Sequence, residues 1–526
     1  MKKTVLSTKK LYLGVELGST RIKCCLINEN GNTISSGIYN WENEFIDGYW
    51  TYRLDEAIYG IGQCYLDMKN KFTLAYGFNL SHLDGIGISA MMHGLIALDG
   101  ANRLLTPFRT WRNNNTIECA KELSDLLHFN IPARWSISHL YYSIKNKESF
   151  VPNITKITTL ASYIHQKLCG VSTIGTNDAS GILPVDENGE YNQKFIDLIN
   201  QKFLEHNCSL NLHSILPSIS QVGTPCGVLS PEGASILDPE GDLLPGCPLC
   251  PPEGDAATGM ISTNSIATRS ANISAGTSIF GSFVLDKPLT NYHPEIDVVI
   301  TPDCKTVAMI HCNNGTGGIN ALIKLVDETL KSFGVWKDEL EIYDILFQSA
   351  INYKGDLKHM VSYNYVSGEN LTDIKYGSLM LATSPEGNLA LGSVVLMQLF
   401  SSFITFSLGV DILKREGYSF ENIFAHGGIF KTKVVAQKIL ASVLDQPVSI
   451  NEAASEGGAW GMAVLALYLE HSKKVPLEEY LKTIIFNDYH IKTEKADEHF
   501  KHIFNQYKKN FLACLPAERK LGEELK

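Results

Sequence analysis

Two segments of this 526-residue chain, at 14–27 and 273–285, share one layout. Each runs from an apolar strand through a turn of small residues into a second apolar strand. Glycine lets the backbone approach a ligand closely, and the N–H groups and hydroxyls of such turns suit phosphate oxygens. Either turn alone is more often an ordinary hairpin. One copy near the start of each half, however, predicts a duplicated fold with a nucleotide held between the halves.

The length of the chain limits the number of domains it can form, and its charge limits the classes of partner it can bind. A chain this long exceeds a single hydrophobic core, so we expect two domains of similar size, at 10–263 and 264–515. The net charge of −11 comes without a basic stripe. Neither nucleic acid nor an anionic membrane is therefore expected as the main partner.

No segment predicts export or a membrane span. Residues 1–10 lack the apolar core and the small-residue cleavage site of a signal peptide. The longest apolar stretch, 389–413, is interrupted by polar residues such as Gln398 and Asp411, which favours a core helix. The 12 cysteines are scattered, and the one CxxC, Cys247-Pro248-Leu249-Cys250, lacks a second CxxC or a His pair at zinc spacing, so we expect a reduced, cytoplasmic protein.

The pattern of apolar residues indicates an α/β fold. A β-rich opening through Asn40 precedes segments in which apolar residues recur at every third and fourth position. Helices are expected at 54–71, 116–128, 160–169, 192–204, 319–333, 389–414, 434–444 and 456–470, with a strand at 83–89. Such alternation of strands and helices favours the α/β class. The charged segment after Leu515 is expected to be a frayed end.

A proline-rich loop at 222–254 leads to Asp255, which is followed by Ala256 and Ala257. If the two turns hold ATP, this carboxylate is placed to deprotonate the group that accepts phosphate. Gly-Asp before two alanines is also a good helix cap, so a structural role stays open. The chain has no G-x-x-x-x-G-K-[S/T] loop, protein-kinase signature, zinc-protease helix or G-x-S-x-G elbow, so ATP would need another architecture.

A series of short motifs runs along nearly the whole chain. Beyond the two hairpins, they are Gly87-Ile88-Ser89-Ala90-Met91-Met92-His93-Gly94, the segment around Trp111, Thr176-Asn177-Asp178-Ala179-Ser180-Gly181, Gly254-Asp255-Ala256-Ala257, Tyr365-Val366-Ser367-Gly368-Glu369, His426-Gly427-Gly428 and Glu456-Gly457-Gly458-Ala459-Trp460-Gly461. In this order they resemble the FGGY carbohydrate kinases of the actin/hexokinase/Hsp70 superfamily. Each motif is weak alone, but their order is highly specific.

The resemblance implies a fold and a reaction. The fold would be two ribonuclease-H-like, actin-like ATPase domains with a central nucleotide cleft. The reaction would be ATP-dependent phosphorylation of a sugar hydroxyl, with the acceptor bound mainly by the first domain and the nucleotide by the second. Asp255 would be the catalytic base, and ATP and Mg²⁺ would be the cosubstrate and cofactor.

The resemblance also implies an acceptor site. Met92 and His93 match positions that contact the sugar, although a histidine after two methionines is more often a core residue. Trp111 and Asn113 lie in a further acceptor segment, which usually carries Asp and Arg where this chain has Asn113 and Asn115. Amides can bind sugar hydroxyls but supply no charge, so the acceptor need not be that of the best-known members.

Glu16 ends the first strand where the family usually has Asp. Together with Asp255 it is expected to face Mg²⁺ or its waters, and its extra methylene could move the ion or insert a water. A solvent-facing hairpin carboxylate is the alternative role for Glu16. Ala256 also departs from the family, which usually has Asn after the catalytic Asp.

Three glycine-containing turns carry the expected nucleotide contacts. These contacts are Gly18, Ser19, Thr20 and Lys23 in the first hairpin, Gly276, Thr277 and Ser278 in the second, and Gly427, Gly428 and Lys431 near the end. Lys23 fits a solvated strand face equally well, and Gly427 with Gly428 fits a strand-to-helix turn that needs glycine. Glu456 is better explained as a first-turn helix charge than as a catalyst.

The acceptor segment at 89–94 looks closest to xylulose kinases, with some likeness to gluconate kinases. We therefore expect a ketopentose such as D-xylulose, phosphorylated at its terminal primary hydroxyl, with gluconate, ribulose or another ketose or polyol as alternatives. A homodimer is compatible with the resemblance. Because the superfamily also contains filaments and chaperones, a nucleotide-gated regulatory protein is the alternative from a different class.

Overall fold

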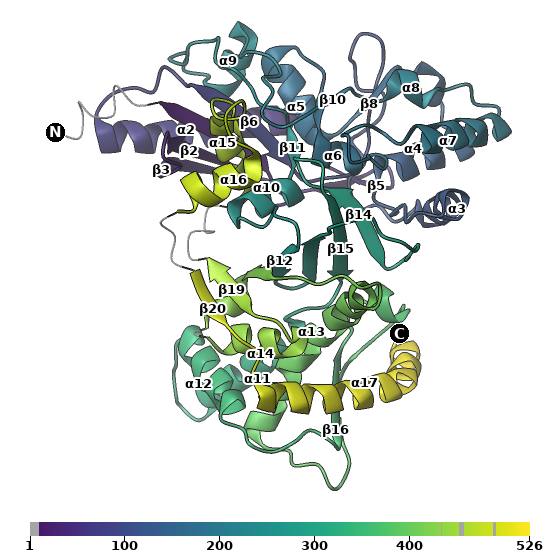
Figure 1. Ribbon diagram of the computed structural model, residues 1–526, viewed down its shortest axis with the longest axis vertical. Coiled ribbons are helices and arrows are strands. Elements are labelled where there is room, and N and C mark those ends of the chain that lie inside the picture. Colours follow the sequence, from purple (N-terminus) through teal and green to yellow (C-terminus); the bar gives the residue numbers. More distant parts are fainter. Residues whose placement is uncertain (1–9, 433, 452–456, 488–490) are drawn as a thin grey trace. The chain divides into compact units, whose positions relative to one another are not determined.

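The structure is a computed structural model that describes residues 10–432, 434–451, 457–487 and 491–526. The described chain forms two compact units (Figure 1). The first unit comprises the described residues of Met1–Ala267, Asn291–Val307 and Ala453–Asp488, and the second those of Thr268–Thr290, Ala308–Glu452 and Tyr489–Lys526. Segments 291–307 and 457–487, which the sequence places in the second domain, thus fold with the first unit.

The first unit is built around a mixed sheet. Its sheet strands are β1 (Leu11–Leu17), β2 (Arg21–Asn28), β3 (Thr33–Asn40), β6 (Gly85–Ala90) and β11 (Glu253–Gly254). Its other strands are β4 (Glu44–Ile46), β5 (Tyr49–Thr51), β7 (Ile96–Leu98), β8 (Lys156–Thr158), β9 (Ile174–Gly175), β10 (Ile219–Ser220) and β14 (Ile296–Ile300). Its helices are α2 (Leu54–Tyr76), α3 (Ile117–Leu127), α4 (Ser136–Lys145), η1 (Val151–Asn153), α5 (Leu160–Cys169), α6 (Thr176–Ser180), α7 (Gln193–Glu205), α8 (Leu212–Ile215), α9 (Pro231–Leu237), α10 (Asp255–Ser262), α15 (Gly457–Tyr468), α16 (Leu477–Tyr480) and η5 (Leu481–Ile485).

The second unit has its own sheet and a layer of long helices. Its strands are β12 (Ser270–Ala275), β13 (Ile279–Val284), β16 (Met360–Asn364), β17 (Leu379–Thr383), β18 (Asn422–His426), β19 (Val448–Asn451), β20 (Ile491–Glu494) and most of β15 (Thr306–Cys312). Its helices are α11 (Gly317–Ser332), α12 (Glu339–Ile351), η2 (Asn370–Thr372), α13 (Leu391–Arg415), η3 (Gly428–Lys431), α14 (Val435–Leu444) and α17 (Glu498–Glu524).

The two sheets repeat one topology. In the first unit the strand order is β3-β2-β1-β6-β11, and in the second it runs β15-β13-β12-β18-β19 before β20. The first strand of each unit pairs antiparallel with its hairpin partner, β1 with β2 and β12 with β13. It pairs parallel on its other side, β1 with β6 and β12 with β18. The α/β class and the duplicated fold expected from the sequence are confirmed.

Local signals set several helix ends where the sequence predicts them. In α5 the Thr159 side chain accepts a hydrogen bond from the Ser162 N–H, which caps the first turn. The helix ends at Gly170, whose φ of 77° is a left-handed conformation that glycine adopts without strain. The observed bounds of α5 therefore coincide with the expected helix at 160–169.

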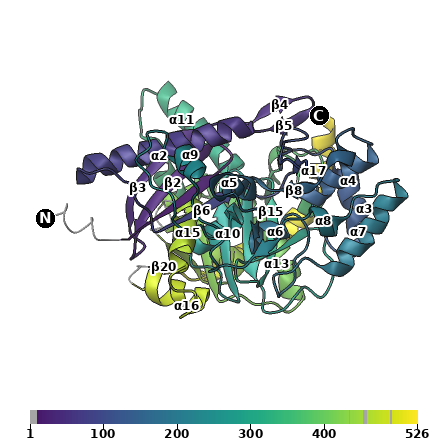
Figure 2. The ribbon, with the colours of Figure 1, turned by 90° about the horizontal axis from the view of Figure 1, so that it is seen from above.

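Helices α2 and α15 cover opposite faces of the first sheet (Figures 1 and 2). A Cβ on Gly14 would lie 1.9 Å from a backbone carbonyl of α15, and one on Gly37 would lie 2.1 Å from a backbone carbonyl of α2. Gly14 pairs with Cys25 and Gly37 pairs with Cys24. Consecutive strand residues point to opposite faces, so these glycines let one helix approach each side of the sheet.

Helix α13 lies in the interior of the second unit. By length and composition alone it could cross a membrane, but 89% of its most apolar window is buried within the fold. A mostly buried apolar helix of this kind is typical of a protein core, as the sequence predicts for 389–413.

The expectation of a frayed end after Leu515 is wrong, because α17 continues through it to Glu524. The carboxylate of Glu518 is fully buried and accepts hydrogen bonds from the Ser378 N–H and hydroxyl, at 2.6 and 2.7 Å. A Cβ on Gly522 would lie 2.0 Å from the Tyr376 carbonyl oxygen. The charged tail is thus held by contacts with a segment far away in the sequence.

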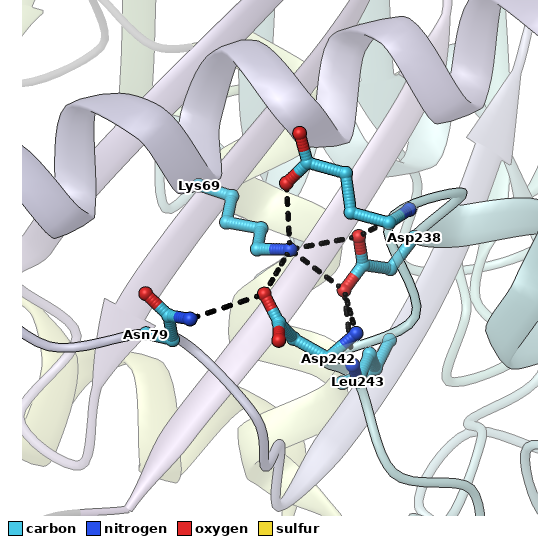
Figure 3. Close-up of polar contacts among 6 residues, drawn as sticks. Lys69, Asn79, Asp238, Asp242 and Leu243 are labelled. Carbon is cyan, nitrogen blue, oxygen red and sulfur yellow. Dashed lines mark hydrogen bonds and ion pairs between the residues drawn. The ribbon is translucent and has the colours of Figure 1, made fainter.

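A buried lysine ties α2 to the loop that follows α9 (Figure 3). The ammonium of Lys69 is 2.9 Å from Asp238, 3.1 Å from Glu240 and 2.7 Å from Asp242. The side chains of Lys69 and Asp238 are 3% and 0% exposed, whereas solvent reaches Glu240 and Asp242. Asp238 also accepts hydrogen bonds from the backbone N–H groups of Asp242 and Leu243. One cation therefore compensates three carboxylates and fixes the loop.

Replacing Lys69 with methionine should lower the free energy of unfolding by about 3 kcal/mol. The reason is that Asp238 would remain buried without its cation, while solvent access to the other two acids limits the loss. Lys71→Met is the matched control, because Lys71 and its partner Asp67 are both exposed, and it should cost less than about 0.5 kcal/mol. Denaturant unfolding of both variants checks this, and equal midpoints would contradict it.

Candidate functional site

Asp255 lies where β11 ends and α10 begins. Gly254 is the capping residue and has no side chain, so Asp255 is the first helical residue and not the cap. Its Oδ1 accepts a hydrogen bond from the Met92 N–H at 3.4 Å. Its side chain is exposed. The local structure thus leaves the carboxylate open to a ligand, as the proposed base requires.

Solvent reaches Asp255, but the surrounding protein atoms limit its hydration, and this is the main cause that raises its pKa to about 6. The negative charge of Glu16 raises the pKa further. Hydrogen bonds from the backbone N–H groups of Met92 and Ala256 act in the opposite direction. The carboxylate is therefore ionised at neutral pH but basic enough to accept a proton.

Met92 and His93 follow β6, and the Met92 N–H is the group that reaches Asp255. His93 has a φ of 73°, an uncommon value for a residue with a side chain. Its Nδ1 is 3.4 Å from the Gly181 carbonyl oxygen, and its ring stacks on Trp135 at 6.2 Å. Burial and the nearby Arg134 hold the pKa of His93 well below its usual value, so the ring is neutral.

Trp111 and Asn113 lie in the loop before α3. The Oδ1 of Asn113 accepts from the Trp50 N–H at 2.8 Å, and its Nδ2 donates to the carbonyls of Trp50 and Thr110. Both amide hydrogens are thereby used within the protein, which favours a structural role that anchors β5. Trp111 is 38% exposed. Contact of either residue with a sugar stays a prediction.

Two buried carboxylates beside Asp255 were not assigned site roles from the sequence. Glu253 lies two residues before Asp255, and its Oε2 accepts from the N–H groups of Asn177 and Asp178 at 3.1 and 3.2 Å. Burial is the main cause that raises the pKa of Glu253 to about 8 and of Asp178 to about 7. Glu253 offered a sequence signal, a second carboxylate two residues before Asp255, but only folding brings Asp178 beside it.

Glu16 faces the N-terminus of α15. It pairs across the hairpin with Lys23, and it accepts a backbone hydrogen bond from Ala459. A Cβ on Gly458 would lie 2.5 Å from its Oε1, so the glutamate fits because this helix begins with glycine. Burial raises the pKa of Glu16, while Lys23 and the Ala459 N–H lower it.

The residues expected to hold Mg²⁺ offer few ligands of their own. Within the described ranges, no group of three or more His, Cys, Asp or Glu side chains is arranged to hold a metal ion. Glu16 and Asp255 nevertheless lie close enough for their charges to interact. Magnesium in phosphoryl-transfer sites uses one or two carboxylates together with waters and substrate phosphates. The carboxylate pair is compatible with such a site.

The first glycine turn is held from one side by two aromatic residues. The Trp41 indole donates to the Gly18 carbonyl oxygen and the Tyr52 hydroxyl donates to that of Ser19, both at 2.7 Å. The Gly18 N–H donates to the Arg21 carbonyl oxygen at 2.9 Å. These bonds fix the turn, and Thr20 at its tip is exposed.

A cavity of about 270 Å³ lies within the second unit. Its lining residues are Gly276, Thr316, Asn320, Glu339, Leu340, Tyr343, Gly428, Ile429 and Thr432. The Tyr343 hydroxyl donates to Asn320 Oδ1 at 2.7 Å, which orients the amide. Two predicted nucleotide contacts, Gly276 and Gly428, are therefore brought to one cavity. Asn320 and Tyr343 carry no motif by which the sequence could have revealed them.

The second glycine turn is clamped to the start of α11. The N–H groups of Gly315 and Thr316 donate to the carbonyl oxygens of Thr277 and Gly276, at 2.7 and 2.9 Å. A Cβ on Gly427 would lie 2.1 Å from the Ala275 carbonyl oxygen, so this glycine is required by packing as well. The side chain of Lys431 and the whole of Glu456 lie outside the described residues.

Glu253→Gln should reduce the loss of stability that the protein shows as pH rises from about 5 to 8. Because the folded-state pKa of Glu253 is raised to about 8, its contribution to stability is complete below the unfolded value of 4.5 and declines up to about 8. A difference of one between the folded and unfolded pKa corresponds to about 1.4 kcal/mol. Glutamine keeps the acceptor for the α6 N–H groups but does not ionise.

The measurement is the unfolding midpoint at pH 5 and at pH 8. Glu232→Gln, at an exposed glutamate of α9, is the control and should follow the wild type. If the midpoint of Glu253→Gln depends on pH as steeply as that of the wild type, the burial of an ionising Glu253 is not the cause.

Comparison with known proteins gives matches along most of the chain. The N-terminal domain of the FGGY family of carbohydrate kinases matches residues 11–237, and the C-terminal domain of that family matches residues 271–470. A xylulose kinase of Haemophilus influenzae is 21% identical over 95% of this chain and 98% of its own length. A gluconokinase of Bacillus subtilis is 22% identical over 87% of each chain.

Solved structures share the fold. A ligand-bound xylulose kinase of Lactobacillus acidophilus superposes with a TM-score of 0.79 and 16% identity, over 97% of this chain and 100% of that one. A gluconate kinase of the same species has a TM-score of 0.80 and 16% identity, over 99% and 100%. At such identities the likeness establishes the two-domain, actin-like fold alone.

Proposed function

This chain belongs to the FGGY family of carbohydrate kinases, and from that premise we propose that it phosphorylates a ketopentose such as D-xylulose. The γ-phosphoryl group of ATP would pass to the terminal primary hydroxyl and give D-xylulose 5-phosphate. Support comes from relatives that are named xylulose kinases and from the likeness of segment 89–94 to them. The gluconokinase relative makes gluconate the competing acceptor.

The observation that carries the proposal is Asp255 beside Met92 and His93. An ionised carboxylate open to solvent, with a pKa raised to about 6, suits removal of a proton from a sugar hydroxyl. His93 is neutral and supplies no competing base of higher pKa. In the first unit, Met92 and His93 would bind the acceptor and Asp255 would accept its proton.

The reaction then follows ordinary phosphoryl-transfer chemistry. As the proton moves to Asp255, the acceptor oxygen bonds to the γ-phosphorus of ATP and the bond to the ADP oxygen breaks. The protein has little covalent chemistry to perform, so its contribution is to position the groups and to stabilise charge.

Each unit would supply its own contacts to the nucleotide. In the second unit the 270 Å³ cavity would hold the nucleoside, with Gly276 and Gly428 allowing close approach of the backbone. In the first unit the turn Gly18, Ser19 and Thr20, with Lys23, would contact phosphate oxygens. Glu16 and Asp255 would bind Mg²⁺ or its waters, and the ion would neutralise charge on the phosphates.

Domain roles, location and assembly belong to the same proposal. The first domain, 10–263, would bind the sugar and carry Asp255, and the second, 264–515, would bind the nucleotide. A small metabolic acceptor and the reduced cysteines fit a cytoplasmic enzyme. A homodimer stays a prediction from the family resemblance.

Coupled ADP release with ATP and Mg²⁺ should respond to one acceptor in a panel of ketopentoses, ketohexoses, polyols and gluconate. Asp255→Asn should reduce turnover about 10² to 10⁴-fold, the usual contribution of a general base, while ATP binding is largely retained. Asp197→Asn, at an exposed carboxylate of α7, should leave turnover unchanged. ADP release that ignores both the sugar and Asp255 would refute the assignment of the base.

Turnover should fall about tenfold per pH unit below about pH 6, because only ionised Asp255 accepts the proton and its pKa is raised to about 6. Since the charge of Glu16 is one cause of the raised pKa, Glu16→Gln should move the acid limb to lower pH. The pH dependence of kcat/KM for both proteins is the measurement. An acid limb that stays in place in the variant would show that the two carboxylates are not coupled.

A further inference from the structure

A buried hydrogen-bond network in the second unit connects the turn at 367–369 with the second glycine turn, at 276–278. Its centre is Asn314, which lies in the loop between β15 and α11 and is only 5% exposed. The Asn314 side-chain nitrogen donates to the Gly368 carbonyl oxygen at 2.6 Å, and its Oδ1 accepts from the Ser367 N–H at 3.0 Å. The loop before α11 is therefore tied to the turn at 367–369.

Glu369 strengthens this connection from the same turn. It is only 1% exposed, and its Oε2 accepts from the backbone N–H and the side-chain amide of Asn314, at 3.4 and 3.3 Å. The backbone N–H groups of Asn313 and Leu371 also donate to its carboxylate. Residues 367–369 thus hold both the main chain and the side chain of Asn314.

The residues that follow Asn314 hold the second glycine turn directly. The N–H groups of Gly315 and Thr316 donate to the carbonyl oxygens of Thr277 and Gly276, at 2.7 and 2.9 Å. A Cβ on Gly315 would lie 2.4 Å from the Gly276 carbonyl oxygen, so the two backbones are in direct contact. The position of the glycine turn therefore depends on the position of the loop.

This contact also sets the direction of two N–H groups. A peptide unit is planar, so a carbonyl that is held in place fixes the N–H of the next residue as well. The bonds to the carbonyl oxygens of Gly276 and Thr277 thereby orient the N–H groups of Thr277 and Ser278. Within the described part of the chain neither N–H has a hydrogen-bond acceptor, and Thr277 is exposed. Both donors are thus available to a ligand.

The burial of Glu369 is costly for a group with a purely structural role. Burial is the main cause that raises its pKa to about 7, and its Oε1 is buried without a partner in the described structure. Glu518, another buried glutamate of this unit, has both carboxylate oxygens hydrogen-bonded to Ser378. Buried polar atoms are normally satisfied in this way. The unsatisfied oxygen of Glu369 therefore indicates a functional constraint.

We propose that Asn314 and Glu369 are positioning residues for ATP. By fixing the loop at 313–316 they would hold the Thr277 and Ser278 N–H groups in the direction in which these groups donate to phosphate oxygens. Neither residue would touch the nucleotide. Their contribution is that ATP binding does not have to order the turn, which would reduce affinity. The inference rests on the proposed function, since it assumes that this turn binds ATP.

Asn314→Ala and Glu369→Ala should each weaken ATP binding about tenfold, because each removes hydrogen bonds that hold the turn. Glu369→Gln keeps the size of the side chain and one acceptor oxygen, so it should fold with a smaller loss of stability and weaken binding about threefold. Calorimetric titration of the full chain with ATP and Mg²⁺, without sugar and well below the unfolding midpoint of each variant, is the measurement.

Glu518→Gln is the matched control, because Glu518 is a buried glutamate of the same unit that binds Ser378 and not the loop at 313–316. It should lower the unfolding midpoint and leave the affinity for ATP unchanged. If Asn314→Ala and Glu369→Ala behave in the same way as this control, the two residues only stabilise the unit and the proposal is overturned.

The double variant of Asn314 and Glu369 adds a test of the shared loop. Because both residues act through that loop, the double variant should bind ATP within about threefold of the more weakly binding single variant. A loss equal to the product of the two single losses would overturn the proposal. Weakened ATP binding in variants of a protein that phosphorylates no sugar would support this inference and refute the proposed function. A wild type that binds no ATP would refute both.

Discussion

The first unit depends on the close approach of α15 to the sheet and to α10. A Cβ on Gly14 would lie 1.9 Å from a backbone carbonyl oxygen of this helix, and a Cβ on Gly461 would lie 2.2 Å from the Thr258 carbonyl oxygen of α10. Larger residues at these positions would push the elements apart. The same helix fixes Glu16 through the Ala459 N–H. A segment near the end of the chain therefore sets the positions of Glu16 and of α10, the helix whose first residue is Asp255.

The first unit treats its buried acids in two ways. Around Lys69, one ammonium compensates three carboxylates and holds a loop to α2. Around Asp255, the acids lie together with no such cation among the described residues, and their pKa values are raised. Buried acids whose pKa values are raised cluster at functional sites. The contrast within one fold distinguishes a structural cluster from the candidate site.

The duplicated topology explains why the two glycine turns lie at equivalent positions of their sheets. Each turn joins the first two strands of a unit, and each is tied down by hydrogen bonds from elsewhere in the same unit. In the first unit Trp41 and Tyr52 hold the turn, and in the second the start of α11 does. One arrangement of strands thus presents small-residue turns twice, with different supports.

The sequence by itself determined the features that depend on nearby residues. The hairpins, the bounds of α5 and the apolar character of α13 follow from periodicity, caps and turn chemistry. The order of the motifs indicated the family, and the family indicated Asp255 as the expected base and Met92 as an expected acceptor contact. These signals are local or ordered along the chain, so they can be recognised before folding.

Only the tertiary structure decided which distant residues meet. It brought α15 into the first unit, placed Asp178 beside Glu253, and joined Asn320 and Tyr343 at the cavity of the second unit. It also bound the charged tail after Leu515, which the sequence alone describes as solvated. Such contacts arise from packing between elements far apart in the chain. The local sequence of either element does not show which distant element it will contact.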